Sequence, residues 1–218
     1  MSREPPGTAW QLEPPPDDHP SDLWAVGADL RPGTLLAAYR LGLFPMPLEG
    51  LVGWFSPALR AVVPLAGYAP SRTLRRAAAQ YEIRIDTAFH EVVRGCARPG
   101  EPGSWIDDVI LAAYTELHEL GFAHSLEAWD DDGLAGGLYG VAIGGLFAAE
   151  SMFYRRTDAS KAAFAALVRL LQDAGDAAKR VLDVQWSTPH LASLGAVEID
   201  RGLYRRRLTA ALSLSQPF

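Results

Sequence analysis

A glycine-rich hairpin that leads into an apolar strand with one carboxylate constrains the fold of this chain most. Residues 134–143 predict one strand and residues 146–153 the next, with a turn at Gly144-Gly145. Glu150 is the one charged residue of the second strand, and a helix with Asp158 at its N-cap is predicted to follow. Because an ionised carboxylate in apolar surroundings is costly unless a cation meets it, Glu150 predicts a ligand.

The strand around Glu150 predicts a small pocket. Because side chains alternate along a strand, the residues expected on the same face as Glu150 are Leu146, Ala148 and Met152. A carboxylate among such neighbours can hold an α-ammonium group while the pocket takes an apolar side chain. The alternative is that Glu150 pairs with Arg155 or Arg156 and only supports the sheet.

A later strand, residues 181–187, carries a second pair of polar residues. Asp183 and Gln185 lie two apart, so they are expected on one face, opposite Leu182, Val184 and Trp186. Asp183 could orient an attacking amine or take its proton, with Gln185 holding the geometry. The alternative is a half-solvated strand with a polar outer face. Together with Glu150, the pair suggests a site that handles an amine.

The rest of the chain predicts a mixture of helices and strands. Residues 1–22 hold six prolines and predict an extended arm without a helix. Composition near Pro64 to Pro70 places a boundary between a small domain, residues 1–66, and a larger domain, residues 67–218. The further helices are expected at 33–41, after Ser71, at 88–97, from Asp107 to Gly121, near 190–194 and at 203–212. The further strands are expected at 54–63, 83–85 and 124–129.

Composition excludes several classes of protein. The net charge of −6 argues against indiscriminate binding to nucleic acid. No apolar run is long enough to span a membrane, and the N-terminus lacks the pattern of a secretory signal, so a cytoplasmic protein is expected. Cys96 is the single cysteine, which excludes an internal disulfide and a cysteine-based zinc site. The histidines show no metal-ligand spacing, and no metal is expected.

Two enzyme classes are disfavoured by local pattern. No Gly-x-Ser-x-Gly elbow exists for a serine hydrolase, and His190 is interpreted as a structural histidine. Residues 172–177 match the Q-x-x-G-x-A string with which acetyltransferases bind the coenzyme A pyrophosphate. That device needs the string at a helix N-terminus, whereas Gly175 is expected to close a helix here. The match is therefore interpreted as chance.

Ordered motifs over residues 23–200 resemble the leucyl/phenylalanyl-tRNA–protein transferase family of the bacterial N-degron pathway. The motifs are Leu36-x-x-Tyr39-x-x-Gly42-x-Phe44-Pro45, Trp54-Phe55-Ser56-Pro57-x-x-Arg60-Ala61-Val62, Trp105-Ile106, Tyr114-x-x-Leu117-His118-x-x-Gly121-x-Ala123-His124-Ser125-Leu126-Glu127, Gly136-Gly137-x-Tyr139-Gly140-Val141, Glu150-Ser151-Met152-Phe153 and Asp183-x-Gln185-x-x-x-x-His190-x-x-Ser193-Leu194-Gly195.

This resemblance implies a reaction, a fold and partners. The family transfers leucine or phenylalanine, and methionine less well, from aminoacyl-tRNA to an N-terminal Arg or Lys of a protein and so marks it for degradation. The fold implied is α+β, a small N-terminal α/β domain followed by a GNAT-like acyltransferase domain with a mostly antiparallel mixed sheet. No metal, nucleotide or coenzyme A is implied, because the tRNA ester is already activated. We expect a monomer that does not bind membranes.

The resemblance also implies roles for individual residues. Asp183 and Gln185 would be catalytic, orienting or deprotonating the acceptor amine, and Glu150 would lie beside the aminoacyl group. The apolar pocket would be formed by Leu138, Phe147, Met152 and Leu167. Trp54 and Trp105 would pack on the terminal adenosine. The tRNA acceptor stem would meet Arg72, Arg75 and Arg76.

Some positions depart from the family pattern, and two other functions remain open. Leu138 replaces an expected methionine, Ala149 an expected glycine, and residues 50–53 differ from an aromatic-rich loop, so the shape of the pocket and the amino-acid preference are open. The runner-up function is a GNAT-like N-acyltransferase that uses acyl-coenzyme A on a small amine. A third is an RNA-binding module without catalysis, against which the Asp183 and Gln185 pair argues.

Overall fold

The computed structural model describes residues 2–98 and 104–218. The helices are α1 (Pro32–Arg40), α2 (Arg72–Ala78), α3 (Phe89–Ala97), α4 (Asp108–Glu119), α5 (Ala159–Asp173), α6 (Pro189–Ser193) and α7 (Arg201–Ala211). The strands are β1 (Leu23–Val26), β2 (Phe44–Leu48), β3 (Leu51–Phe55), β4 (Leu59–Val63), β5 (Glu82–Ile85), β6 (Ala123–Asp130), β7 (Gly133–Ile143), β8 (Leu146–Tyr154), β9 (Val181–Gln185) and β10 (Val197–Asp200).

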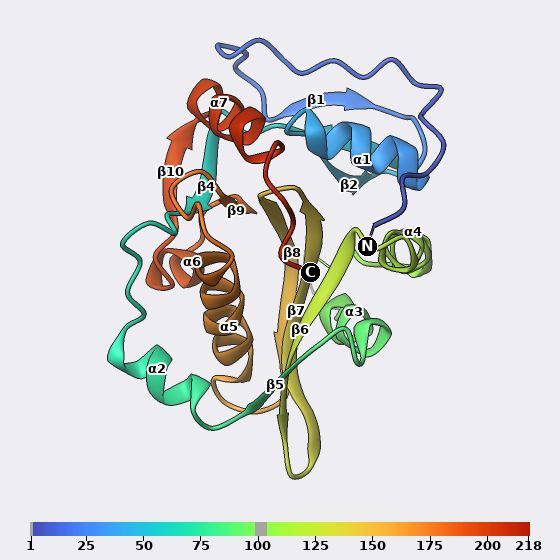
Figure 1. Ribbon diagram of the computed structural model, residues 1–218. Coiled ribbons are helices and arrows are strands. Elements are labelled where there is room, and N and C mark those ends of the chain that lie inside the picture. The colour runs from blue at the N-terminus through green and yellow to red at the C-terminus, as the bar shows by residue number, and fades with distance from the viewer. Residues whose placement is uncertain (1, 99–103) are drawn as a thin grey trace.

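A seven-stranded sheet in the order β10-β4-β9-β8-β7-β6-β5 forms the centre of the molecule. Helices α3 and α4 cover one face, and α5 with α2 covers the other (Figure 1). Within the described residues, β8 and β9 are the one parallel pair of this sheet, and α5 makes the crossover between them. The prediction of a mixed, mostly antiparallel sheet in an α+β protein is confirmed.

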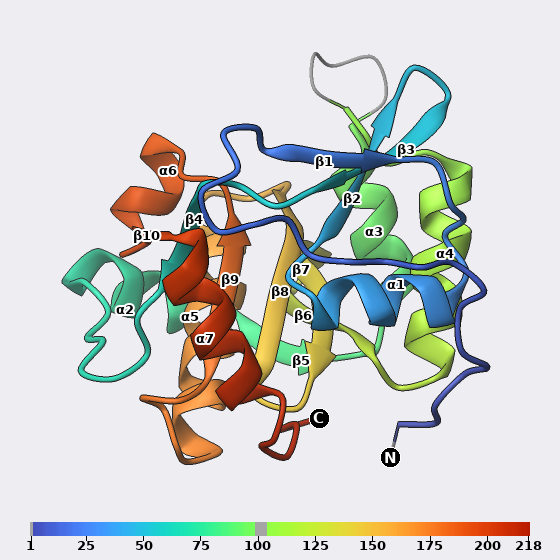
Figure 2. The ribbon, with the colours of Figure 1, turned by 90° about the horizontal axis from the view of Figure 1, so that it is seen from above.

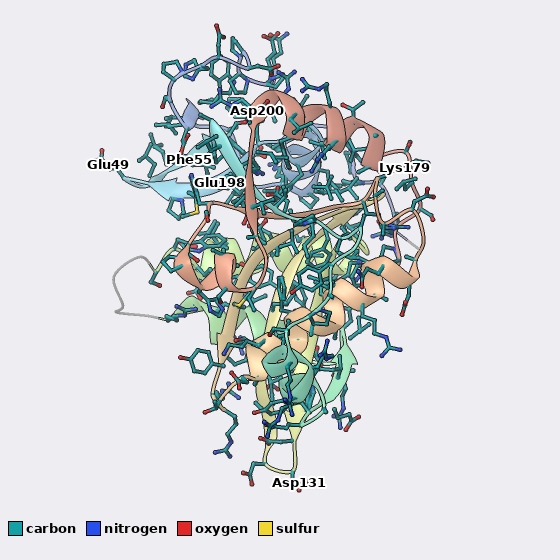
Figure 3. The ribbon with its side chains drawn as sticks, turned by 90° about the vertical axis from the view of Figure 1, so that its left-hand side faces the viewer. Glu49, Phe55, Asp131, Lys179, Glu198 and Asp200 are labelled. Atoms are coloured by element: carbon teal, nitrogen blue, oxygen red, sulfur yellow. The ribbon has the colours of Figure 1, made fainter. Side chains whose placement is uncertain are left out.

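A second sheet of three strands, in the order β1-β3-β2, packs with α1 above one end of the large sheet. Its hairpin turns at Glu49 and Gly50, both with positive φ (49° and 83°), as a two-residue turn between twisted strands requires. Glu49 at this tip projects from one side of the molecule, far from Asp131 at the β6–β7 turn (Figure 3). The domain division at residues 66 and 67 stays a prediction, since β4 precedes it yet pairs with β9 and β10.

The single strand predicted over residues 54–63 is wrong. The chain leaves β3 at Phe55 and, after Ser56-Pro57, enters β4, which belongs to the other sheet. Proline cannot donate a ladder hydrogen bond, so it ends the first strand. The sequence analysis also missed β1, β2 and β10, which are four or five residues long, and β2 in addition contains Pro45 and Pro47.

The arm is confirmed as a segment without helices or strands, since residues 2–22 run along the small sheet, α1 and α7 (Figure 2). Arg201, almost fully buried, donates hydrogen bonds to the carbonyl oxygens of Pro16, His19 and Ser21, and also to that of Ser56. Arg201 therefore ties the arm to the last helix.

Helix starts show where cap prediction succeeds and fails. Ser71 accepts a hydrogen bond from Leu74 N, and Asp107 accepts from Val109 N and Ile110 N, as predicted. Asp158 precedes α5 as predicted but makes no side-chain cap, because its backbone is left-handed (φ 65°) and its carboxylate instead meets Lys161 Nζ at 2.6 Å. None of the helices in residues 2–98 and 104–218 is both long and apolar enough to cross a membrane.

Candidate active site

Glu150 lies in a β-bulge of β8. Tyr139 pairs with Ser151 and Gly140 with Ala149, so Glu150 is the extra residue between the two pairs. A bulge reverses the alternation of side chains and re-aims the bulged one. Met152 consequently packs with the α5-side core, whereas Ala148 packs with the α3 and α4 side, and the predicted single face for these residues is wrong.

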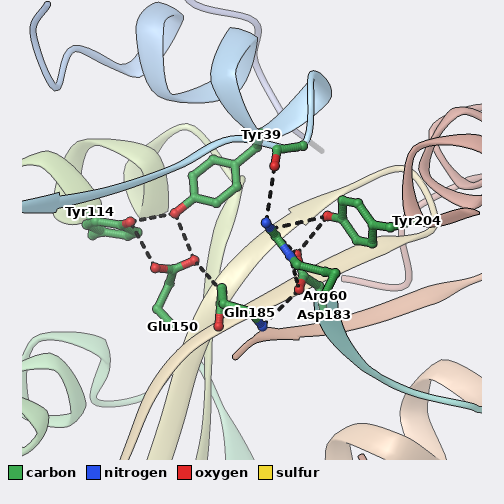
Figure 4. Close-up of polar contacts among 8 residues, drawn as sticks. Tyr39, Arg60, Tyr114, Glu150, Asp183, Gln185 and Tyr204 are labelled. Carbon is green, nitrogen blue, oxygen red and sulfur yellow. Dashed lines mark hydrogen bonds and ion pairs between the residues drawn. The ribbon is translucent and has the colours of Figure 1, made fainter. Parts of the chain in front are cut away.

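Three polar side chains surround the Glu150 carboxylate (Figure 4). Tyr39 of α1 lies 2.8 Å from Oε1 and Tyr114 of α4 lies 3.1 Å from Oε2, while the two hydroxyl oxygens are 2.5 Å apart. Gln185 of β9 donates from Nε2 to Oε1 at 3.3 Å. Residues from two helices and two strands therefore meet at one carboxylate.

Glu150 does not pair with the arginines that follow it. Arg155 donates to the Leu134 carbonyl oxygen, and Arg156 pairs with Asp132 at 2.5 Å. Among the described residues, Glu150 has no Lys, Arg or His nitrogen within 4 Å. The alternative of a purely structural ion pair is therefore wrong for Arg155 and Arg156.

Burial controls the protonation of this cluster. Burial raises the pKa of Glu150 to about 7, although hydrogen bonds from Tyr39 and Tyr114 act in the opposite direction. Burial and the neighbouring carboxyl group hold the pKa of both tyrosine hydroxyls well above its ordinary value. The neutral form of Glu150 is therefore favoured up to a much higher pH than in an exposed glutamate.

Asp183 is fully buried and surrounded by donors. Arg60 donates from Nε to Oδ1 at 2.8 Å and from Nη2 to Oδ2 at 2.6 Å. Oδ1 also accepts from the backbone N of Gln185 at 2.9 Å, and Oδ2 from the Tyr204 hydroxyl at 2.7 Å. The alternative of a half-solvated strand is wrong, because Asp183 is 0% exposed.

Arg60 connects the two sheets of the molecule at this point. Its guanidinium lies 4.6 Å from the ring centroid of Phe44 and 4.5 Å from that of Tyr204, and it donates to the Gly42 carbonyl oxygen. Burial opposes the charge on Arg60, but the Asp183 carboxylate outweighs it and raises the pKa of Arg60. The pair fixes β9 against β4.

Gln185 ends β9 in a left-handed conformation (φ 59°), which is uncommon for a residue other than glycine. Ala61 pairs with Gln185 and Val62 with Asp183, so Val184 is bulged between them. Leu182 and Val184 pack toward α5, but Trp186 packs at 4.7 Å from the Phe44 ring, on the other side of the sheet. The prediction that Trp186 shares a face with these two residues is wrong.

A pocket of about 340 Å³ opens beside Glu150 and Gln185. Its apolar lining includes Ala149, Met152, Val184 and Leu191. The other predicted pocket residues lie in the core on the α5 side of the sheet, each 0% exposed, and they are Leu138, Phe147 and Leu167. Of the predicted aminoacyl pocket, Met152 lines this space directly.

The predicted tRNA-contacting residues lie apart from this pocket. Trp54 is buried in the core that α1 shares with α3 and α4, and it donates to the Gly27 carbonyl oxygen at 2.8 Å, while Trp105 is half-buried just before α4. Arg72, Arg75 and Arg76 are exposed on α2, which packs against α5 (Figure 1). The structure thus brings together Glu150, Asp183, Gln185 and Met152, but not the tryptophans or α2.

Four site residues were missed by the sequence analysis: Tyr39, Tyr114, Arg60 and Tyr204. The first three stand in the family motifs, but Tyr39 and Tyr114 have helical core spacing, which hides a polar role. In the part of the chain that the structure describes, no three His, Cys, Asp or Glu side chains are grouped as metal ligands would be.

The coenzyme A string is not a phosphate site. Gly175 (φ 77°) follows the C-terminal end of α5, and Gln172 donates to the carbonyl oxygens of Leu65 and Tyr68. The string therefore terminates a helix and anchors the segment before α2, as its sequence position indicated.

Comparison with known proteins identifies the family. The model of the leucyl/phenylalanyl-tRNA protein transferase matches residues 62–209, and that of its N-terminal domain matches residues 28–58. A transferase of this name from Chlorobium limicola is 47% identical over 85% of this chain and 97% of the relative. One from Aromatoleum aromaticum is 49% identical over 86% of this chain and 80% of the relative.

A comparison of structures adds no argument about the fold. The structure of L-PGS from Bacillus licheniformis gives a TM-score of 0.40 at 13% identity, over 75% of this chain and 55% of that chain. The sequence relationship carries the assignment: this chain belongs to the leucyl/phenylalanyl-tRNA–protein transferase family.

Proposed function

We propose that the pocket beside Glu150 and Gln185 is where this aminoacyltransferase joins leucine or phenylalanine to a protein. The donor is aminoacyl-tRNA, and the acceptor is the α-amine of an N-terminal Arg or Lys, with methionine transferred less well. The observation that supports this most is a half-buried carboxylate at the edge of an apolar pocket, whose hydrogen-bond donors among the described residues are all uncharged. Such a carboxylate is costly unless a cationic group of a substrate meets it.

Glu150 binds the α-ammonium group of the aminoacyl ester. The apolar lining at Ala149, Met152, Val184 and Leu191 takes the leucine or phenylalanine side chain. Leu138, Phe147 and Leu167 support this lining from the core, so they determine its shape without touching the substrate. This arrangement explains how one pocket could select an amine and an apolar side chain together.

Gln185 orients the acceptor amine, and Asp183 orients Gln185. All four acceptor positions of the Asp183 carboxylate are occupied by Arg60, Tyr204 and the Gln185 backbone. A carboxylate engaged in this way favours positioning over proton removal. Aminolysis then forms the N–C bond and breaks the ester C–O bond, while a proton passes from the amine to the ribose oxygen.

The remaining parts of the proposal concern the contacts with tRNA, the type of fold and the state of the protein in the cell. Arg72, Arg75 and Arg76 bind acceptor-stem phosphates, and Trp54 and Trp105 are the aromatic candidates for the terminal adenosine, which for buried Trp54 requires local movement. The large domain is of the GNAT-like type, and the protein works as a cytoplasmic monomer without metal or coenzyme A. The position of the Gln172 to Ala177 string speaks against the acyl-coenzyme A alternative.

The test is transfer of labelled leucine from leucyl-tRNA to a peptide that begins with Arg. A matched peptide that begins with Ala is the control for acceptor recognition, and unacylated tRNA with free leucine is the control for the ester. Transfer to the Arg peptide alone is the expected result. No transfer to either peptide by folded protein would contradict the proposal.

A further inference from the structure

Tyr39, Tyr114 and Glu150 form a closed ring of hydrogen bonds. Three oxygen–oxygen contacts make the ring, at 2.5 Å between the hydroxyls, 2.8 Å from Tyr39 to Oε1 and 3.1 Å from Tyr114 to Oε2. Each contact needs one hydrogen between its two oxygens, but each hydroxyl supplies only one. The two tyrosines therefore fill two of these contacts, and a proton on Glu150 fills the third.

An ionised Glu150 would leave two oxygens facing each other without a hydrogen. In a buried site, such a contact is strongly unfavourable. The proton count therefore points to a neutral Glu150 in the free protein, and the raised pKa of this group agrees with it. An ammonium group beside Glu150 favours the ionised carboxylate over the neutral carboxyl group, because it supplies a positive charge and hydrogen-bond donors to the carboxylate.

We propose that Glu150 carries one proton in the free protein, that the α-ammonium group of the aminoacyl substrate expels this proton on binding, and that Tyr39 and Tyr114 are positioning residues whose hydrogen bonds favour the ionised carboxylate of the complex. The proposal rests on the proposed function, in which Glu150 contacts that group. No covalent bond changes in this step: the ring proton goes to solvent, and the ammonium group keeps its own protons.

The other charged and titratable groups near Glu150 do not supply the missing hydrogen of the ring. Arg60 and Asp183 act on Glu150 in opposite directions, and they form a buried ion pair with each other. Arg98 and His190 line the same pocket, and partial burial together with Lys161 lowers the pKa of His190. Tyr139 of β7 is close enough to interact, and its pKa is well above its ordinary value because it is buried.

The test uses an amide-linked leucyl-adenosine, in which a stable amide replaces the ester. Calorimetry in buffers of different ionisation enthalpy measures the protons released on binding. At about pH 6 the ligand amine is charged, and release of about one proton is expected from wild-type protein. A ligand without the amine, and the Glu150→Gln variant, are both expected to release none.

The tyrosines are tested by the pH profile of affinity. Wild-type affinity is expected to rise about fivefold from pH 6 to pH 7. Tyr39→Phe or Tyr114→Phe removes a hydrogen bond to the charged carboxylate. The midpoint of the profile of affinity against pH should therefore move to higher pH by roughly 0.5 to 1 unit. Tyr139→Phe is the matched control, because its buried hydroxyl has no hydrogen-bond partner among the described residues, and its profile should not move.

Three results would overturn the proposal. Binding without proton release would show that Glu150 is already ionised. A loss of affinity in both Tyr→Phe variants by one factor at every pH would reduce the tyrosines to structural roles. Failure of wild-type protein both to bind the analogue and to transfer leucine would contradict the proposed function itself. Leucine transfer without proton release would contradict only the proposal that Glu150 carries a proton.

Discussion

Glu150 places a carboxyl group where burial raises its pKa from an ordinary value of 4.5 to about 7. The folded protein therefore favours the protonated form more than the unfolded chain does. The stability that this preference contributes is fully present below about pH 4.5 and is lost as the pH rises through 7. Glu150 is thus kept at a cost to stability, as expected of a residue retained for binding.

This cost can be measured with Glu150→Gln, which removes the titrating group. Relative to wild type, the free energy of unfolding of this variant should rise by roughly 2 to 3 kcal/mol between about pH 5 and pH 8. Denaturant titrations of both proteins at the two pH values give the difference. An equal gap at both pH values would show that the pKa of Glu150 is not raised.

Asp183 illustrates the opposite situation, a buried charge that is fully paired. Asp183→Asn leaves the Arg60 guanidinium without its countercharge, and we expect a loss of about 3 to 5 kcal/mol in the free energy of unfolding. Tyr204→Phe removes one hydrogen bond from the same carboxylate and should cost only about 1 kcal/mol. Similar stabilities for the two variants in chemical denaturation would refute this ranking.

The sequence alone pointed to Glu150 and Asp183, because a charged residue within an apolar strand can be recognised without a structure. It did not point to Tyr39 and Tyr114. Each tyrosine occupies a core position of its helix, and at such a position its sequence spacing is the same as that of a leucine. The hydroxyl partner comes from a distant segment, so the role of these residues appears only in three dimensions.

At the level of elements, two strand irregularities build the site. The bulges at Glu150 in β8 and Val184 in β9 lie on neighbouring parallel strands and bring Glu150 within 3.3 Å of Gln185. The bounds of β8 were predicted to within one residue and those of β9 to within two. A bulge leaves no mark in the alternation of a short strand, so the faces beyond each bulge were assigned incorrectly.

Helix α2 carries the proposed contacts to tRNA. Replacement of Arg72, Arg75 and Arg76 by Ala should raise the KM for leucyl-tRNA, lower the slope of log affinity against log salt by roughly 2 to 3, and leave kcat little changed. Arg169→Ala on the exposed face of α5 is the control, because Arg169 already pairs with Asp173. An unchanged salt slope in the triple variant would place the tRNA elsewhere.

At the scale of the whole molecule, Arg201 joins α7 to the arm and to the β3–β4 connection through five donated hydrogen bonds to backbone carbonyl oxygens. The proline-rich composition predicted the absence of helices in the arm but not this attachment, since an arginine side chain is usually exposed to solvent. The arm is thereby part of the folded unit.

Arg201→Leu should release the arm, because leucine replaces only the aliphatic part of the arginine side chain and donates no hydrogen bonds. We expect faster proteolysis within residues 2–22 and a loss of about 3 kcal/mol or more in stability. Arg207→Leu, an exposed position on the same helix, is the control. Equal proteolysis of the two variants would contradict the anchoring role of Arg201.

The central claim is that Glu150 recognises the α-amine of the aminoacyl group. Single-turnover transfer from leucyl-tRNA should be compared with transfer from the same tRNA charged with the corresponding 2-hydroxy acid, in wild type and in Glu150→Gln. Wild type should prefer the amine by about 10- to 100-fold, and the variant should lose most of this preference. An undiminished preference in Glu150→Gln would contradict the account.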